Sequence, residues 1–341
     1  MSAEIPAGAM RFNSDSQKLE YWNGSAWFQV HTATPNLASA GDVTPGARGV
    51  IGGGNNPAYL TDIEFVNISS TGNATDYGDL TDSRGALTAL ASRTRAVFAC
   101  GYSPGDVNTI DFITIASGGT AEDFGDNTAS GNNGARYAPS GVSNSTRGLI
   151  GGGQAVPAGT KYAEITYVTI AQTGNSVAFG DLTSARGDSG ACANSTRGIF
   201  AGGSPGNNVI DFVNIATLGD AQDFGDLVGD SKRGCHGGGA SAIRGIFGGF
   251  KTPTQLDDID FITITSTGNA MDFGNLTATL THGAACSSVT RCIWTGGYRG
   301  GSKSVTIDYV QIQTQGDAVD FGDLTDDPHY HSACSNGHGG L

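Results

Sequence analysis

The tripeptide Asp-Phe-Gly is the first feature of this sequence whose residue types could do chemistry. An Asp in that setting can ligate the magnesium ion that accompanies ATP in phosphoryl transfer. The sequence, however, has neither a glycine-rich phosphate loop with its pairing Lys nor an HRD-type catalytic loop. An active site is made once, whereas this tripeptide recurs, so it predicts a structural repeat. Copies begin at Asp123, Asp223, Asp272 and Asp320, and near-copies begin at Asp76 and Ala178.

A second candidate is the segment His-Tyr-His-Ser-Ala-Cys, which contains His329, His331 and Cys334. On a strand, His-x-His places both rings on one face, a workable spacing for a chelate. A firm metal site needs three or four ligands, and no third ligand is evident nearby. Whether His329 and His331 bind a metal stays open, and we expect no cofactor. Because the chain also lacks a G-x-S-x-G elbow and an HExxH motif, we expect a protein that is not an enzyme.

The elements that position these residues belong to a repeat of about fifty residues. Its marker is a segment such as Thr-Arg-Gly-Ile-Phe-Ala-Gly-Gly, whose Arg recurs at steps of 47, 52, 50, 47 and 47. That period is typical of propeller blades rather than of helical solenoids. Each copy reads as four short antiparallel strands, so the sequence predicts an all-β, six-bladed β-propeller. The repeated arginines are Arg48, Arg95, Arg147, Arg197, Arg244 and Arg291.

An acid follows each repeated Arg on the next expected strand, with Thr166 in its place in the third copy. The arginines could form an anion-binding rim. A cross-strand ion pair within each blade is the preferred interpretation, because both partners share one period. The acids are Glu64, Asp111, Asp211, Asp260 and Asp308.

A strand of small residues precedes each repeated Arg except the first, as in "DSGACANS" from Asp188. Small side chains fit where strands converge on an axis, and the cysteines there are expected to be buried thiols rather than disulfides. The matching segment "HSACSN" stands at the C-terminal end of the chain. We therefore expect a strand at about 330–336 to complete the first blade and leave no open sheet edge.

Residues 1–45 lie outside the repeat and are predicted to form a small β-meander and a linker over residues 31–46. The meander should span Gly8 to Val30, with turns at Asn13-Ser14-Asp15 and Asn23-Gly24. A sheet this small and aromatic is marginal alone, so it should dock on a partner or on its own copies. The candidate docking residues are Phe12, Tyr21, Trp22 and Trp27.

Charge limits the classes of partner. The chain has 18 Lys and Arg against 32 Asp and Glu, a net charge of −14, so nucleic acid and anionic membrane surfaces are poor partners. The first residues lack the basic start and apolar run of a secretory signal, and no apolar run is long enough to span a membrane. We expect a protein that is made in a cytoplasm and inserts into no membrane.

Taken together, the small-residue strand, "RGIFGG", "IDFITI" and "DFGDL" resemble a kelch repeat over roughly residues 46–341, with Phe or Tyr at the usual Trp position. The segment around Arg11, Phe12, Asn13, Asp15, Leu19, Glu20, Trp22, Asn23, Gly24 and Trp27 resembles an element of bacteriophage fibre and virion proteins. The repeat also resembles those of cyanophage virion proteins. These resemblances imply a virion structural protein, a tail-fibre or capsid-surface component that contacts other virion proteins through residues 1–45.

Two functions remain for such a protein. The propeller could bind host-surface glycan, or it could be an architectural decoration or spacer of the capsid or tail. Ligands bind where loops break the repeat, and the two prime segments are Thr128 to Gly141 and Gly297 to Ser304. Each holds an Arg and a Tyr that could stack on sugar: Arg136 with Tyr137, and Arg299 with Tyr298. The sequence indicates neither the receptor, the location on capsid or tail, nor the state of the expected homo-oligomer.

Overall fold

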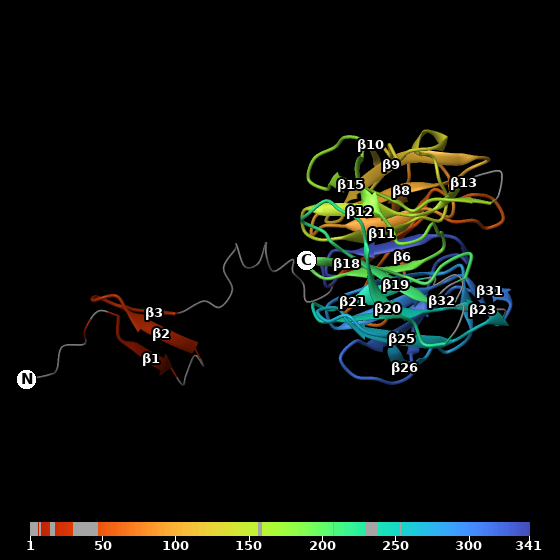
Figure 1. Ribbon diagram of the computed structural model, residues 1–341. Helices are drawn as coiled ribbons and strands as arrows, with labels where there is room; N and C mark the ends of the chain where they lie inside the picture. Colours follow the sequence, from red (N-terminus) through yellow and green to blue (C-terminus); the bar gives the residue numbers. More distant parts are fainter. Residues whose placement is uncertain are drawn as a thin grey trace, which may run out of the picture. The chain divides into compact units, whose positions relative to one another are not determined.

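The computed structural model describes residues 6, 8–13, 18–29, 47–155, 159–206, 208–229, 237–252 and 254–341. The chain divides into two compact units, Met1–Pro45 and Gly46–Leu341. Both are built from β-strands (Figure 1), and the described residues contain no α-helix, only a single 3₁₀ turn at Asn132–Gly134. Among those same residues, no helix has the length and apolar character needed to cross a membrane.

The first unit is a three-stranded antiparallel meander. Its strands are β1 (Met10–Asn13), β2 (Lys18–Trp22) and β3 (Trp27–Gln29), in the order β1-β2-β3. The predicted turn at Asn23-Gly24 joins β2 to β3: Asn23 Oδ1 accepts hydrogen bonds from the backbone N–H groups of Ser25 and Ala26, and Gly24 has a φ of 103°. The expected turn around Ser14 and Asp15 and the expected linker over residues 31–46 lie outside the described residues.

The second unit contains six four-stranded antiparallel sheets within its described residues. From inner to outer strand, the first is β34 (Ser332–Ser335), β4 (Arg48–Gly52), β5 (Asp62–Asn67), β6 (Thr75–Asp79), and the second is β7 (Thr88–Ala91), β8 (Arg95–Tyr102), β9 (Asp106–Thr114), β10 (Glu122–Asp126). The third is β11 (Ser140–Ser143), β12 (Arg147–Gly151), β15 (Glu164–Thr169), β16 (Val177–Asp181), and the fourth is β17 (Gly190–Ala193), β18 (Arg197–Ala201), β19 (Val209–Asn214), β20 (Gln222–Asp226). The fifth is β21 (Gly238–Ala240), β22 (Arg244–Gly248), β25 (Asp258–Thr263), β26 (Met271–Asn275), and the sixth is β28 (Ala284–Ser287), β29 (Arg291–Thr295), β32 (Thr306–Gln311), β33 (Val319–Asp323).

Short extra strands extend three of the connections between the second and third strands of a sheet. They are the pair β13 (Gln154–Ala155) and β14 (Thr160–Lys161), and the pair β23 (Lys251–Thr252) and β24 (Thr254–Gln255). A three-stranded element joins β27 (Leu280–Thr281), β30 (Tyr298–Arg299) and β31 (Ser302–Lys303). In Figure 1 the labelled members β13, β23 and β31 lie at one end of the second unit, and the C-terminal residue lies at the other.

The Asp-Phe-Gly tripeptide has a structural role on the outer strand of each sheet. In the second to sixth sheets its Phe is buried and meets an aromatic ring of the neighbouring strand edge to face, as Phe124 meets Phe112 with centroids 5.9 Å apart. The first sheet has the half-buried Tyr77 at this position. Its Gly lets a neighbouring sheet approach. A Cβ on Gly322, where φ is 149°, would lie 2.5 Å from the backbone oxygen of Gly72 in the first sheet. The same backbone contact recurs between each sheet and the next.

Each repeated Arg links its own sheet to the following one. Its guanidinium lies over an aromatic ring of its own sheet and donates a hydrogen bond to a backbone oxygen after the third strand of the next sheet. The prediction that it pairs with the acid of its own repeat is wrong: in the register Arg95 lies opposite Thr114, whereas Asp111 lies opposite Phe98. The acceptors, in chain order of the arginines, are the backbone oxygens of Ile115, Ile170, Ile215, Ile264, Ile312 and Ile68.

The repeated acids instead accept hydrogen bonds from the preceding sheet, which explains the Thr of "DFGDLT". Thr81 donates its hydroxyl to Asp111 at 2.8 Å, and Arg84 forms a buried ion pair with the same carboxylate at 2.8 Å. Equivalent Thr–acid bonds join Thr183 to Asp211, Thr277 to Asp308, and Thr325 to Glu64. The last bond joins the sixth sheet to the first.

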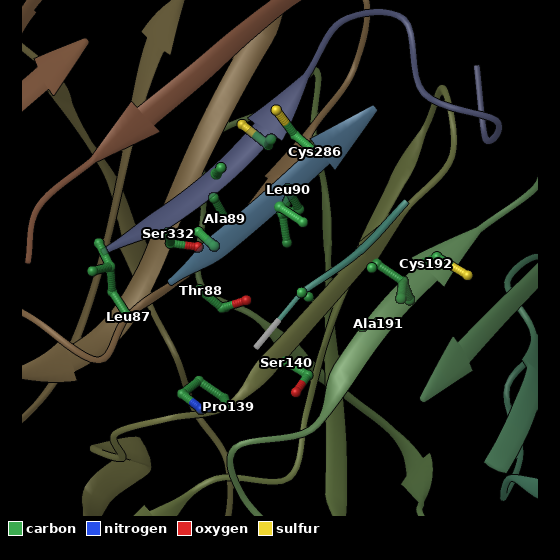
Figure 2. Close-up of a pocket in the computed structure, with 18 of the residues that line it drawn as sticks. Leu87, Thr88, Ala89, Leu90, Pro139, Ser140, Ala191, Cys192, Cys286 and Ser332 are labelled. Atoms are coloured by element: carbon green, nitrogen blue, oxygen red, sulfur yellow. The ribbon is translucent and has the colours of Figure 1, made fainter. Parts of the chain in front are cut away.

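The six inner strands contact one another in the order β34, β7, β11, β17, β21 and β28, and β28 in turn contacts β34. Their small and hydroxyl-bearing side chains surround a channel of about 160 Å³ (Figure 2). The C-terminal strand expected at about 330–336 is β34, which pairs with β4. Five cysteines fall in the described part of the chain. All five are buried and none of them forms a disulfide, namely Cys100, Cys192, Cys286, Cys292 and Cys334.

The residues after β34 close one end of this channel. His338 Nε2 lies 3.2 Å from Ser143 Oγ and 3.1 Å from the backbone oxygen of Ala91, and Gly339 N donates to the backbone oxygen of Ala240. Ala91, Ser143 and Ala240 belong to three different inner strands, β7, β11 and β21. The tail therefore holds several sheets together at this end, which is also where the unit's first described residue, Ala47, precedes β4.

Candidate functional site

The opposite end of the channel carries the side chains that differ most between repeats. Two positions of the repeat meet there: the residue seven positions after the repeated Arg, and the residue two before the inner strand. The first position holds Asn55, Tyr102, Gln154, Ser204, Lys251 and Tyr298, and the described copies of the second hold Ala86, Ala138, Asp188, His282 and Tyr330.

All five described residues at the second position adopt a left-handed backbone, with φ between 52° and 59°. Glycine would adopt it more cheaply, by roughly 1–2 kcal/mol per residue. Their backbones link neighbouring sheets, since Ala138 N donates to Ala86 O and Asp188 N donates to Ala138 O. Side chains kept at a strained position indicate a role beyond the backbone link, and Asp188, His282 and Tyr330 are the polar members.

A cup of about 420 Å³ opens at this end. Its lining combines aromatic rings with a few polar groups, a composition typical of small-ligand sites. The floor shares Ala86, Asp188 and Tyr330 with the channel. The lining residues with side chains able to contact a ligand are Asn55, Tyr59, Tyr102, Tyr137, Gln154, Asp188, His329 and Tyr330.

Three tyrosines form a continuous row along the cup, one from each of the first three sheets. The Tyr59 and Tyr102 ring centroids are 5.7 Å apart, and those of Tyr102 and Tyr137 are 6.1 Å apart. All three rings are half-buried. Burial raises the pKa of Tyr59 and of Tyr137, so both phenols stay neutral at physiological pH and can donate as well as accept hydrogen bonds.

Asp188 and Gln154 supply the polar part of the floor. Gln154 Nε2 donates to Asp188 Oδ2 at 2.9 Å. Burial raises the pKa of Asp188, while the bond from Gln154 and the charges of Lys161 and Lys251 oppose that rise. The Asp188 charge in turn helps to raise the pKa of Tyr137 and that of Tyr330, the latter to about 12. The carboxyl thus lies within electrostatic reach of two phenols.

The histidines of the predicted metal segment are held by other contacts. His329 packs against Tyr298 and Tyr330, with centroids 4.9 and 5.3 Å away, while His331 Nε2 lies 2.9 Å from Thr295 Oγ1. Burial lowers the pKa of both, that of His331 to about 4. Within the ranges that the structure describes, no three His, Cys, Asp or Glu side chains are grouped so that they could hold a metal ion.

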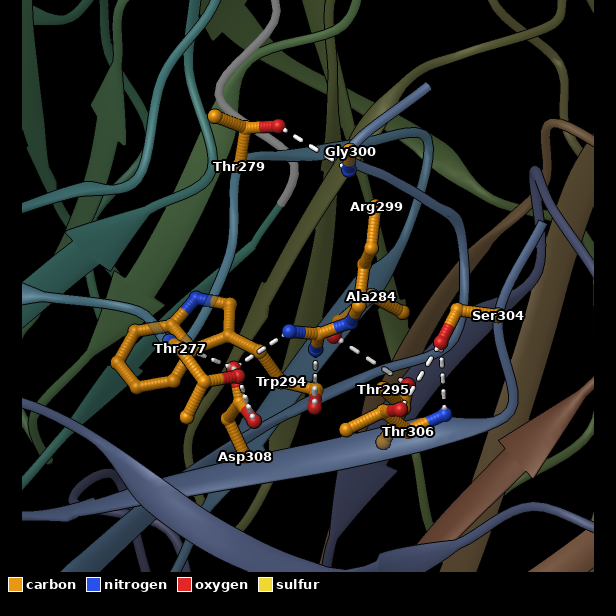
Figure 3. Close-up of polar contacts among 10 residues, drawn as sticks. All are labelled: Thr277, Thr279, Ala284, Trp294, Thr295, Arg299, Gly300, Ser304, Thr306 and Asp308. Atoms are coloured by element: carbon orange, nitrogen blue, oxygen red, sulfur yellow. Dashed lines mark hydrogen bonds and ion pairs between the residues drawn. The ribbon is translucent and has the colours of Figure 1, made fainter. Parts of the chain in front are cut away.

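Of the four residues predicted to bind sugar, the two arginines do not reach a ligand. Arg136 is 1% exposed and donates to the backbone oxygens of Gly152 and Glu164. Arg299 forms a buried ion pair with Asp308 and donates to the backbone oxygen of Trp294 (Figure 3). The expectation that these guanidiniums stack on sugar is therefore wrong, because both are buried and bond to groups inside the fold.

The two predicted tyrosines lie at the surface, in different surroundings. Tyr137 lines the cup, next in sequence to the buried Arg136. Tyr298 is half-buried and meets the rings of His282 and His329. Five lining residues of the cup were not predicted from the sequence: Tyr59, Tyr102, Gln154, Asp188 and Tyr330. Their signal was available in the alignment of the repeats, because most of them occupy the two positions at which this end of the scaffold varies.

The predicted docking residues of the meander divide between its two faces. Met10, Phe12, Tyr21 and Phe28 share one face, as their register shows, and are 41–66% exposed. Trp22 and Trp27 lie on the other face, where their centroids are 5.5 Å apart and the Arg11 guanidinium lies 4.2 Å from the Trp27 ring centroid. The apolar face is thus the stronger docking candidate, and the tryptophans stabilise the meander itself.

A comparison with models of protein families and a comparison with curated proteins each found no match to this chain.

Proposed function

We propose that the six sheets of the second unit are the blades of a six-bladed β-propeller of kelch-like type. Three sets of contacts support this arrangement: the Arg hydrogen bonds, the contacts of the Asp-Phe-Gly glycines, and the succession of inner strands. Each set runs from one sheet to the next and then from the sixth to the first. A ring buries both faces of every blade, which one isolated blade cannot do.

We further propose that the chain is a non-enzymatic structural protein of a bacteriophage virion, a tail-fibre or capsid-surface appendage whose propeller binds host-surface glycan. The observation that carries the glycan part is the cup, where a row of tyrosines faces a carboxyl and an amide. Sugar rings offer apolar C–H faces to aromatic rings and hydroxyls to polar groups. The virion part rests on the sequence resemblances of residues 8–30 and of the repeat.

The direction of the chain within the second unit fits this proposal. Inner strands start at the cup and second strands start at the opposite end, so Ala47, the first described residue of the second unit, lies away from the cup. We propose that residues 1–45 contact other virion proteins and further copies of the chain.

Binding of labelled full-length protein and of residues 46–341 to a glycan panel and to host cells tests this function. Binding by both supports a glycan-binding propeller. If neither binds while the full-length protein still associates with virion components, the chain is an architectural decoration or spacer, and the receptor role is wrong.

A further inference from the structure

We propose that Asp188 sets the specificity of the cup, by binding two adjacent hydroxyls of an uncharged sugar. The inference rests on the proposed glycan binding and adds the class of glycan. It concerns a residue at the cup floor, on the approach to the inner strand β17 of the fourth sheet.

The Asp188 carboxyl is oriented by the protein and leaves an acceptor for a ligand. Gln154 Nε2 holds Oδ2 at 2.9 Å, and Oδ1 makes no hydrogen bond within the described part of the chain. The residue is half-buried and lines both the cup and the channel. A fixed carboxyl with an unused oxygen is well suited to accept hydrogen bonds from neighbouring hydroxyls.

The backbone around Asp188 indicates that the carboxyl is kept for its chemistry. Its φ of 54° is the conformation that Ala86 and Ala138 adopt at the equivalent positions of the second and third sheets. The fold therefore accepts a methyl group at this position, and nothing in the sheet-to-sheet backbone bond requires a carboxyl. Asp188 supplies a carboxyl at a position where the second and third sheets use only a methyl group.

The surroundings favour a neutral ligand. The tyrosines Tyr137 and Tyr330, whose pKa values respond to the Asp188 charge, offer neutral phenols to sugar hydroxyls. A sugar carboxylate or sulfate would lie against the Asp188 carboxyl in a partly desolvated site, where repulsion between like charges is strong. Lys161 and Lys251 oppose the rise that burial causes in the pKa of Asp188, which favours its charged form.

The test uses the full-length chain and immobilised polysaccharides: mannan and galactan as neutral probes, periodate-oxidised mannan as a probe whose adjacent hydroxyls are cleaved, and alginate and carrageenan as anionic probes. Wild type should bind a neutral probe. Its affinity for mannan should fall at least tenfold when the mannan has been oxidised with periodate. Asp188→Ala should weaken the same binding by about tenfold or more, the effect of losing hydrogen bonds to a charged acceptor. Asp223→Ala, which removes an exposed carboxylate from β20, is the matched control and should bind like wild type.

Each other outcome is decisive. Equal binding by Asp188→Ala and wild type, unchanged binding to oxidised mannan, or preference for alginate or carrageenan overturns the role of Asp188 while glycan binding stands. Absence of binding by wild type to every probe and to host cells overturns glycan binding itself. Because Ala already occupies this backbone conformation twice, the variant should keep the melting temperature of wild type, and a loss of folding would be visible there.

Discussion

The guanidinium of Arg291 donates a hydrogen bond of 2.8 Å to the backbone oxygen of Ser69, a residue 222 positions earlier in the chain. It also lies over the ring of Tyr309, 4.8 Å from the centroid. This contact joins the last sheet to the first in the way that the other repeated arginines join consecutive sheets. It shows why each repeat carries an Arg although no acid of its own repeat pairs with it.

Removal of one such link should cost stability locally. Arg197 donates to the backbone oxygen of Ile264 at 2.8 Å and lies 4.7 Å from the centroid of Phe212. We expect Arg197→Ala to lower the free energy of unfolding by about 1–2 kcal/mol, since one hydrogen bond and one cation–π contact are lost. Urea denaturation measures this, with Arg93→Ala at an exposed turn as the control. Equal midpoints for the two variants would contradict the role of the link.

A larger effect is expected at the buried ion pair of Arg186 and Asp211, whose side chains are both fully buried. Asp211→Ala leaves the guanidinium without its partner, and we expect a loss of about 3–5 kcal/mol. At the equivalent position the Thr166 hydroxyl donates a hydrogen bond to Asn127 Oδ1 at 2.7 Å, so Thr166→Ala should cost about 1 kcal/mol. Thermal denaturation of both variants compares the two arrangements, and a smaller loss for Asp211→Ala than for Thr166→Ala would show the account of this pair to be wrong.

The stability of the fold should fall in mild acid. Burial lowers the pKa of His331 from 6.5 to about 4, so between these values the unfolded chain binds a proton that the folded protein does not. The free energy of unfolding therefore decreases as pH falls from about 6.5 to about 4, by roughly 3 kcal/mol from this residue.

Denaturation of wild type and His331→Gln across that pH range isolates the histidine, because the carboxylates titrate in both proteins. The variant should show a shallower dependence on pH. Parallel curves for the two proteins would mean that His331 does not contribute.

The apolar face of the meander should mediate association. Phe12 and Tyr21 are 66% and 41% exposed on that face. We expect Phe12→Ser with Tyr21→Ser to shift the full-length chain toward monomer in sedimentation velocity experiments, since exposed apolar area drives contact. Val177→Ser, at a 53% exposed site on β16, should leave the distribution of species unchanged. A double variant that associates like wild type would place the interface elsewhere.

The sequence was sufficient to predict the four-stranded sheets, but not the partners of individual side chains. The period near fifty residues and the alternating strands predicted four-stranded antiparallel sheets, because hydrophobic pattern sets strands and register. The partner of Asp111 could not be read from its own repeat, since Thr81 and Arg84 reach it from the preceding sheet. Likewise, Arg136 is buried in the fold whereas the adjacent Tyr137 lines the cup. This difference depends on how neighbouring sheets pack, which the sequence of one repeat does not show.

The cup itself gives the most direct test of the account. Isothermal titration would compare wild type with the variant Tyr137→Ala, Tyr330→Ala, using the neutral polysaccharide that binds best in the panel. Loss of two stacking and hydrogen-bonding rings should weaken binding by at least about tenfold. The melting temperature should change little, because both side chains are partly exposed. Undiminished binding by the variant would contradict the claim that this end of the second unit is the ligand site.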